Sequence, residues 1–227
     1  MRIILSVNYI SRLNTGISNV LKIMLNSYTS LNHKVYIAAM NDEFTEIDKN
    51  DFISSELSII KSKNYITIFY KYFIFYKKSK ADIAHIHSLW SISTIAVYIW
   101  AILYKKRYII STNGMINDWS LKQSKFKKKI FIILIFKNIL KNADNIVVNS
   151  SIEKNYIKQK FNVRNIVIIP NGVKTINPLN FHINKLQNKK IILFLSRIHP
   201  KKGIDLLLKA WEEINQISIN NNFVLHI

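Results

Sequence analysis

A basic loop near the C-terminal end of the chain has residue types that suit the binding of an anion. It reads S-R-I-H-P-K-K-G over Ser196–Gly203, between an expected strand and an expected helix. Arg197 could hold two oxygens of one phosphate, and Lys202 could add a point charge. Cations at a helix N-terminus oppose the helix dipole by roughly 0.3–1 kcal/mol each, and a bound anion would reverse that cost. The loop therefore predicts a phosphate site, and a solvated basic loop is the alternative interpretation.

Two histidines, His85 and His87, lie two residues apart in an expected strand. Their side chains therefore share one face of the sheet, an arrangement that can ligate a metal. The surrounding sequence suggests no third ligand, so we expect no metal site. We interpret His87 as a polar group that lines a substrate cleft or caps the end of its strand.

These residues need a framework, and the sequence supplies one by alternating two patterns. Apolar runs of strand length alternate with segments of helical spacing. The expected strands cover 2–7, 34–39, 82–87, 107–111, 145–149, 165–169, 190–196 and 223–227. The expected helices cover 17–28, 91–104, 130–136 and 204–214, and Ser150 and Glu153 have capping-box spacing at the start of another. The alternation predicts an α/β fold with parallel strands and right-handed crossovers.

The domain organisation follows from where this pattern is interrupted. Residues 1–175 suffice for one Rossmann-like domain, and the polar stretch 176–188 reads as a linker. Residues 189–227 hold only one strand-helix-strand start, and parallel strands are normally covered on both faces. We therefore expect an incomplete second domain, whose strands need neighbours that the sequence does not contain.

Composition narrows the possible partners and the compartment. The formal net charge is +20 and there is no cysteine, which excludes disulfides, thiolate metal sites and a cysteine nucleophile. The charge argues for an anionic partner: phosphate, nucleic acid or an acidic membrane surface.

The longest apolar stretch, Leu89–Tyr104, is shorter than the ~20 residues of a spanning helix, and the N-terminus lacks the features of a signal peptide. A cytoplasmic protein is expected, with peripheral attachment to the inner face of the plasma membrane left open.

Two basic segments bear on that choice of partner. The run Tyr65–Lys80 mixes aromatic residues with lysines, and Lys122–Lys129 is strongly basic. Each could lie on an anionic membrane, or could combine core side chains with a solvated edge. A nucleic-acid partner is not expected, because the basic residues are scattered and no known nucleic-acid-binding pattern occurs.

The whole chain resembles the family 4 (group 1) glycosyltransferases, in five motifs that occur in the family's order. The stretch F-L-S-R-I-H-P-K-K-G-I-D-L-L-L-K-A-W resembles the family's donor-site segment. Residues 169–173 (I-P-N-G-V), 82–87 (D-I-A-H-I-H), 113–115 (N-G-M) and 32–35 (N-H-K-V) resemble four further motifs. The resemblance implies two Rossmann-like domains of the glycosyltransferase B type, the first binding the acceptor and the second a nucleotide-sugar.

The resemblance also implies roles for particular residues. Arg197 and Lys202 would hold the donor diphosphate and stabilise the leaving group, with no metal and no cofactor. Gly16 would let the backbone approach the sugar, although a plain glycine at a helix start is an equal alternative. The other expected substrate-binding residues are His87, Asn113, Asn171 and Gly172.

Three departures from the family pattern limit what carries over. Asn113 stands where the family often has histidine, and an amide cannot take up a proton. Thr15-Gly16 replaces a glycine pair. No two glutamates are eight positions apart, so the family's Glu-x7-Glu motif is expected to belong to the missing part of the second domain.

From the resemblance we expect an enzyme that transfers a glycosyl group, with retention, from a nucleotide-sugar to an acceptor. The acceptor would be a glycan or a lipid-linked molecule in bacterial cell-envelope polysaccharide synthesis, such as that of lipopolysaccharide. The alternatives are an inactive binding or scaffold fragment of such an enzyme and, less favoured, a basic nucleic-acid-binding protein.

Overall fold

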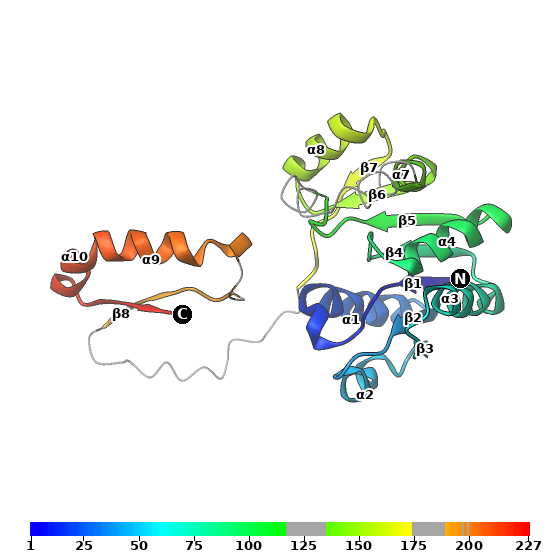
Figure 1. Ribbon diagram of the computed structural model, residues 1–227, viewed down its shortest axis with the longest axis horizontal. Helices are drawn as coiled ribbons and strands as arrows, with labels where there is room; N and C mark the ends of the chain where they lie inside the picture. The colour runs from blue at the N-terminus through cyan, green and yellow to red at the C-terminus, as the bar shows by residue number, and fades with distance from the viewer. Residues whose placement is uncertain (117–134, 174–188, 197, 199) are drawn as a thin grey trace. The chain divides into compact units, whose positions relative to one another are not determined.

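The computed structural model describes residues 1–116, 135–173, 189–196, 198 and 200–227 (Figure 1). It divides the chain into two compact units, Met1–Lys174 and Thr175–Ile227. The linker expected at 176–188 lies outside the described residues, as do the basic segment Lys122–Lys129 and most of the helix expected at 130–136. The domain boundaries therefore remain a prediction.

The first unit is built on a seven-stranded, fully parallel sheet with the order β3-β2-β1-β4-β5-β6-β7. In Figure 1 its strands stack from β3 at the bottom to β7 at the top. The strands are β1 (Arg2–Ser6), β2 (Lys34–Met40), β3 (Glu56–Ile60), β4 (Ile83–Ile86), β5 (Arg107–Ser111), β6 (Asn145–Val148) and β7 (Ile166–Ile168). The chain leaves β1 for β2 on one side and later returns to place β4 on the other, so the strand order reverses at β1. This is the place where open parallel sheets bind ligands.

The helices of the first unit cover the two faces of the sheet unequally. They are η1 (Arg12–Asn14), α1 (Thr15–Ser30), α2 (Thr45–Asp48), η2 (Lys49–Phe52), α3 (Tyr65–Ser79), α4 (Ile92–Leu103), α7 (Lys137–Asn142) and α8 (Ser151–Phe161). Buried side chains of α1 and η2 pack against one face, with Leu21, Leu25 and Phe52. The helices α3, α4, α7 and α8 pack against the other face. In Figure 1, α1 and α3 lie on opposite sides of β1.

Alternation along the strands explains this two-layer core. Ile4 of β1 belongs to the cluster beneath α3 and α4, whereas Ile3 and Leu5 belong to the cluster beneath α1. Successive side chains of a strand point to opposite faces, and both faces of this sheet are buried near β1. The strands expected from the sequence within residues 1–175 are found in the structure, each to within a few residues of its expected bounds.

The segment 41–80, for which no regular pattern was apparent, contains four elements. These are α2, η2, β3 and α3. Tyr72 and Tyr76 of α3 are fully buried, while Tyr65 and Tyr70 are exposed. Asn64 caps α3 by accepting hydrogen bonds from the N–H groups of Ile66 and Thr67. This helix therefore combines core side chains with a solvated edge, which is one of the two interpretations given for Tyr65–Lys80.

The second unit is small and contains a two-stranded parallel sheet. Its elements are β8 (Lys190–Leu193), η5 (Pro200–Lys202), α9 (Ile204–Glu213), α10 (Asn215–Asn220) and β9 (Phe223–His226). Among the described residues of this unit no hydrophobic side chain is fully buried, and Leu193 and Leu206 are largely exposed. The expectation that these strands need further neighbours stays a prediction.

No helix within the described part of the chain has the length and apolar character needed to cross a membrane.

Candidate functional site

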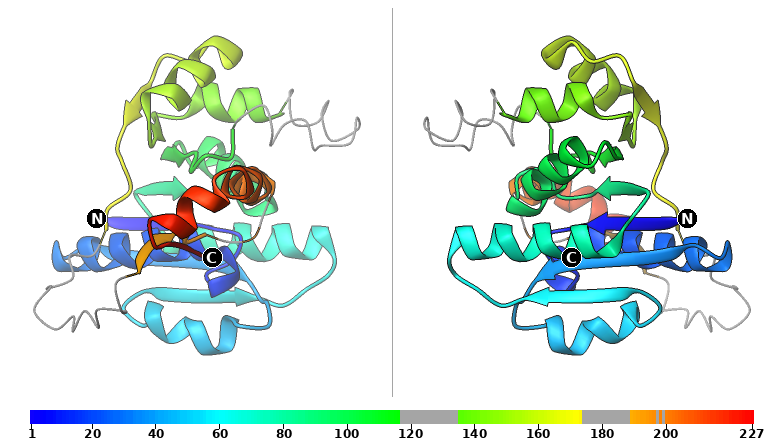
Figure 2. Two further views of the ribbon diagram at one scale, coloured as in Figure 1. Left: turned by 90° about the vertical axis from the view of Figure 1, so that its left-hand side faces the viewer. Right: turned by 90° about the vertical axis from the view of Figure 1, so that its right-hand side faces the viewer.

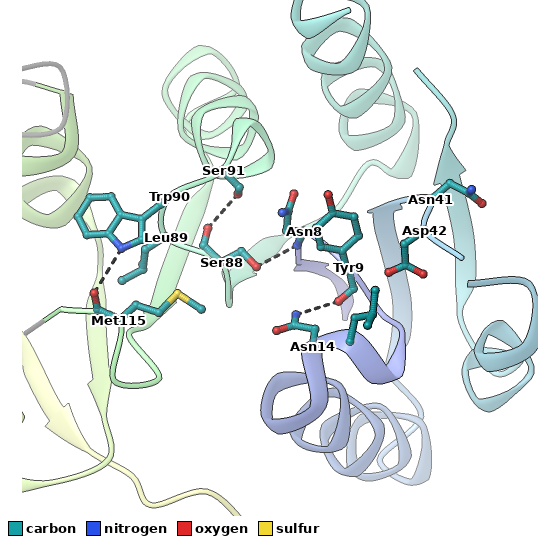
Figure 3. A pocket seen from close by; sticks show the side chains of 11 residues that line it. Asn8, Tyr9, Asn14, Asn41, Asp42, Ser88, Leu89, Trp90, Ser91 and Met115 are labelled. Carbon is teal, nitrogen blue, oxygen red and sulfur yellow. Dashed lines mark hydrogen bonds between the residues drawn. The ribbon is translucent and has the colours of Figure 1, made fainter. Parts of the chain in front are cut away.

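A pocket of about 490 Å³ opens at the carboxyl edge of the first sheet (Figure 3). Its lining residues follow the C-terminal ends of β1, β2, β4 and β5. They are Asn8, Tyr9, Leu13, Asn14, Asn41, Asp42, Ser88, Leu89, Trp90, Ser91 and Met115. The pocket therefore spans the point where the strand order reverses, between β1 and β4.

The loop after β1 forms one wall and is tied to the opposite wall. The Asn8 N–H donates to Ser88 Oγ over 2.9 Å, and the Asn8 carbonyl accepts from the Met40 N–H over 2.8 Å. Asn14 Nδ2 donates to the Tyr9 carbonyl over 3.0 Å, as Figure 3 shows. The backbone of Asn8 is thus fixed between β2 and the loop after β4. Within the described residues, the Asn8 side-chain amide has no hydrogen-bond partner.

The loop after β4 forms the second wall, where Trp90 is the largest side chain. Its Nε1–H donates to the Met115 carbonyl over 3.3 Å, and its ring lies 4.3 Å from that of Phe136. Ser91 caps α4 by accepting from the Thr94 N–H, and both Ser91 Oγ and Thr94 Oγ1 donate to the Ser88 carbonyl. Trp90 is therefore held by both a hydrogen bond and ring packing.

Asp42 is the charged residue among the described residues that line the pocket. Its carboxylate accepts from Ser11 Oγ over 2.5 Å, from Thr45 Oγ1 over 2.8 Å and from the Phe44 N–H over 3.1 Å. These bonds occupy most of its acceptor positions. The carboxylate thus stabilises the turn after β2 by hydrogen bonds. The other described residues that line the pocket are uncharged, and they include aromatic rings and side-chain amides.

A turn after β5, with the N-G-M motif, brings Met115 to the pocket. Asn113 and Gly114 both have left-handed backbones, with φ of 47° and 70°. Asn113 Nδ2 lies 3.4 Å from the carbonyl oxygens of His87 and Ser111, to which it donates. Asn113 therefore joins the ends of β4 and β5 and is not among the pocket-lining residues. A glycine at position 114 suits a turn whose φ is unfavourable for other residues.

The carboxylate of Glu153, at the start of α8, anchors the same turn. It accepts from Thr112 Oγ1 over 2.6 Å, from the Gly114 N–H over 3.0 Å and from the Asn149 N–H over 3.2 Å. Ser150 Oγ accepts from the Glu153 N–H, as the capping-box spacing predicted. In a complete capping box the glutamate side chain would also accept a hydrogen bond from the Ser150 N–H. Here the Glu153 carboxylate accepts instead from groups at the ends of β5 and β6.

His85 and His87 lie beneath this edge as a buried pair. Their ring centroids are 4.1 Å apart, and His85 Nε2 is 2.8 Å from Ser111 Oγ. Burial lowers the pKa of His85 to about 4. Burial, followed by repulsion from His85, lowers the pKa of His87 well below its usual value. Both rings are therefore neutral near pH 7, and neither nitrogen of His87 has a hydrogen-bond partner within the described residues.

The remaining predicted site residues are spread over the first unit. Gly16 is exposed in the first turn of α1, with open space where a Cβ would be, so nothing in the described structure requires a glycine there. Asn171 and Gly172 are exposed after β7, and a Cβ on Gly172 would lie 3.6 Å from Ile23 of α1. His87 is fully buried. The structure does not bring these four residues together in the pocket.

The basic loop of the second unit is described in part. Arg197 lies outside the described residues. Lys202 is exposed at the end of η5, immediately before Gly203, which has a φ of 67° and begins α9 without a side-chain cap. Lys202 is thus at a helix N-terminus, as the sequence predicted. No group of three or more metal-ligating side chains occurs in the described part of the chain.

Sequence reasoning missed most of the pocket. Asn8, Tyr9, Asn41 and Ser88 each follow a strand that was correctly predicted, yet none was singled out. The usable signal was their place after parallel strands, since the carboxyl ends of such strands meet at one edge. A list of the first few residues after each predicted strand would have included them.

The fold and the pocket define a doubly wound α/β domain with a pocket at the carboxyl edge of its parallel sheet. More specifically, the chain belongs to Glycosyltransferase Family 4, whose pattern matches residues 14–176. The family resemblance is thereby confirmed, and four of the five motifs lie within the matched residues, whereas the donor-site segment follows them. No sequence among the curated proteins matches the chain.

Solved structures with similar folds include sugar-nucleotide enzymes. HepE from Anabaena, in complex with UDP, has a TM-score of 0.66 at 10% identity, over 99% of this chain and 68% of that one. A putative UDP-N-acetylglucosamine 2-epimerase from Listeria monocytogenes has a TM-score of 0.59 at 12% identity, over 99% and 61%. The glycotransferase of kitacinnamycin has a TM-score of 0.57 at 11% identity, over 99% and 64%. These likenesses show an α/β fold of the glycosyltransferase B type.

Proposed function

We propose that the protein transfers a glycosyl group from a nucleotide-sugar to an acceptor. The observation that carries the proposal is membership of Glycosyltransferase Family 4 over residues 14–176, combined with a pocket at the carboxyl edge of the matched domain. The complexes of HepE with UDP and with UDP-glucose support a uridine-nucleotide donor by analogy of fold.

The pocket of the first unit would hold the acceptor. Trp90 and Tyr9 offer apolar ring faces, and Asn8 and Asn14 offer amides that can both donate and accept hydrogen bonds. The described lining has no lysine or arginine. Sugar rings present apolar C–H faces and many hydroxyls, whereas a phosphate or carboxylate would need a cation. The pocket therefore favours an uncharged glycosyl residue as the group that accepts the transfer.

The basic loop of the second unit would hold the donor diphosphate. Lys202 stands beside the free N–H groups at the start of α9, and both favour an anion. Arg197 and Lys202 would stabilise the negative charge that develops on the departing nucleotide. No metal and no cofactor enter this proposal, and Gly16, Asn113, Asn171 and Gly172 stay as candidate substrate contacts.

The finer features of the reaction are also proposals. We propose retention of configuration, a glycan or lipid-linked acceptor in cell-envelope polysaccharide synthesis, and a cytoplasmic location at the inner face of the plasma membrane. These features follow from the family resemblance, and the strong positive charge supports the location. An inactive binding or scaffold role for this chain is the alternative.

Donor turnover tests the proposal directly. The chain is incubated with radiolabelled UDP-sugars and a panel of neutral and phosphorylated oligosaccharides. A labelled oligosaccharide is the expected product. Epimerised UDP-sugar without transfer would instead assign the protein to the epimerase chemistry of its structural neighbours. Donor binding without turnover would support the scaffold role.

Two lysines of one helix region provide a matched pair for that assay. We expect Lys202→Ala to lower turnover by about two or more orders of magnitude, the typical cost of losing one preorganised charge contact. Arg197→Ala should behave in the same way. Lys209→Ala, which removes an exposed lysine of α9, should leave turnover unchanged. Full activity of Lys202→Ala would remove the assignment of the donor site.

A further inference from the structure

The outward side of α4 carries apolar side chains where a surface helix usually has polar ones. The helix contains no charged residue. Its inner side is filled by the buried Ala96, Val97, Trp100 and Ala101. On its outer side Ile95 and Ile99 are half-buried, and Ile102 and Leu103 are 54% and 64% exposed. A helix that is apolar on every side is normally covered by something.

Helix α3 extends this surface. It packs beside α4, and the centre of the Phe73 ring lies 6.3 Å from that of Tyr104, the C-cap residue of α4. Ile66 and Tyr70 are exposed on α3. The right-hand view of Figure 2 looks onto the helical layer to which both helices belong. We call this surface the α3–α4 face; it consists of Ile66, Tyr70, Phe73, Ile95, Ile99, Ile102, Leu103 and Tyr104.

The charge around the α3–α4 face is strongly one-sided. Residues 57–116 contain nine lysines or arginines and a single acid, Asp82. Lys77 and Lys78 lie in the last turn of α3, and Lys105 and Lys106 directly follow α4. Within the described residues these four lysines form no ion pair. An apolar surface bordered by uncompensated lysines is complementary to anionic headgroups over an acyl layer.

We propose that the α3–α4 face binds the headgroup region of an anionic lipid bilayer. A spanning arrangement is excluded for α4, because its 12 residues fall well short of the ~20 that a bilayer requires. The same face of a second copy is a poorer occupant, because it would bring the same excess of positive charge and, over residues 57–116, a single acid to pair with it. The inference rests on the proposed location at the membrane, and it assigns that contact to named side chains.

Vesicle flotation of the full chain tests the inference. The probes are phosphatidylcholine vesicles with and without about one-third phosphatidylglycerol, at low and high salt. We expect binding to the anionic vesicles at low salt and little to the neutral ones. Ile102→Glu with Leu103→Glu should lower partitioning by at least about tenfold, since the burial of one leucine or isoleucine side chain alone changes a partition constant by about that factor or more. Lys77→Gln with Lys78→Gln should lower it about tenfold or more at low salt.

Leu31 offers a matched control for Leu103. It is 65% exposed at the C-terminal end of α1, which packs on the opposite face of the sheet, as Leu103 is exposed at the C-terminal end of α4. Leu31→Glu should therefore leave partitioning unchanged, with circular dichroism and thermal unfolding confirming that each variant is folded. Absence of binding to anionic vesicles, or an equal loss for Leu31→Glu, would overturn the inference. Self-association that the α3–α4 variants abolish, with lipid binding unaltered, would reassign the face to a dimer.

The test is independent of catalysis. Transfer to an acceptor in solution, measured without vesicles, should be the same for wild type and the α3–α4 variants. Loss of vesicle binding with retained transfer would leave the proposed function intact. Vesicle binding without transfer would leave the membrane contact intact and contradict the proposed function.

Discussion

The carboxylate of Glu153 accepts a hydrogen bond of 2.6 Å from the hydroxyl of Thr112, 41 residues earlier in the chain. The same oxygen accepts from the Gly114 N–H, and its partner oxygen accepts from the Asn149 N–H. One side chain therefore joins the ends of β5 and β6. It also fixes the left-handed turn that carries Met115 to the pocket.

Replacing Glu153 should destabilise the first unit. Glu153→Ala removes the carboxylate that accepts from the Gly114 and Asn149 N–H groups and from the Thr112 hydroxyl. Hydrogen bonds to a charged group contribute roughly 1.5–3 kcal/mol. We expect the free energy of unfolding to fall by about 2–3 kcal/mol, measured by urea denaturation. Amide hydrogen exchange at Gly114 should accelerate as the turn loosens.

Glu56→Ala is the control for this variant. Glu56 forms an exposed pair with Lys34, and its side chain is 52% exposed. Exposed pairs contribute ~0–1 kcal/mol, so Glu56→Ala should cost less than ~1 kcal/mol. Equal destabilisation by the two variants would show that Glu153 does not anchor the turn.

Glu153 also shows how far sequence reasoning reaches. The spacing of Ser150 and Glu153 is local, and it correctly predicted the cap formed by Ser150. The bonds of Glu153 to Thr112 and Gly114 depend on β5 and β6 being neighbours, which no local spacing encodes. The strands could be predicted because buried apolar runs are local, whereas the pocket combines loops from four strands whose order the sequence alone did not establish.

The pocket leads to a second prediction, on acceptor binding. The Asn8 side-chain amide has no hydrogen-bond partner in the described residues, while the Asn8 backbone is held by Ser88 and Met40. Asn8→Ala should therefore keep the fold and remove one hydrogen bond to the acceptor. At ~0.5–1.5 kcal/mol for such a bond, the KM for the acceptor should rise by roughly threefold to tenfold. The KM for the nucleotide-sugar should not change.

Steady-state kinetics with each substrate varied in turn separates these effects. Asn19→Ala is the control, since Asn19 is an exposed amide on α1 outside the pocket. It should leave both KM values unchanged. A rise in donor KM for Asn8→Ala, with the acceptor KM unaffected, would contradict an acceptor role for this pocket.

The buried histidines predict a dependence of stability on pH. The pKa of His85 is lowered from 6.5 to about 4, and that of His87 is lowered well below 6.5, both mainly by burial. Below pH 6.5 the unfolded chain binds protons that the folded chain does not, so the free energy of unfolding should fall as the pH falls. The slope approaches ~1.4 kcal/mol per pH unit for each histidine.

His87→Leu should remove one histidine's share of that slope. Neither ring nitrogen of His87 has a partner in the described residues, so an apolar side chain of similar size should be neutral or stabilising at pH 7. His85→Leu also loses the contact with Ser111 and should be the less stable of the two variants. Urea denaturation at pH 5, 6 and 7 measures both effects. An unchanged slope in His87→Leu would mean that this ring is protonated in the folded state.

Asp48 should control stability in a different and more acidic range. Arg12 donates to its carboxylate from the side chain, with Nη2 at 2.6 Å from Oδ1, and from the backbone N–H at 2.7 Å from Oδ2. The side-chain and then the backbone hydrogen bond of Arg12 lower the pKa of Asp48 from 3.8 to about 2. A lowered carboxyl pKa stabilises the fold above pH 3.8, and this contribution is lost as the pH falls toward 2.

Asp48→Asn should therefore flatten the pH dependence of unfolding between pH 4 and pH 2, followed by circular dichroism. Asp51→Asn, which removes an exposed pair with Lys22, should leave that part of the profile unchanged. If both variants follow the wild-type profile, the bond between Arg12 and Asp48 does not persist in solution, and the turn before α1 is held by other contacts.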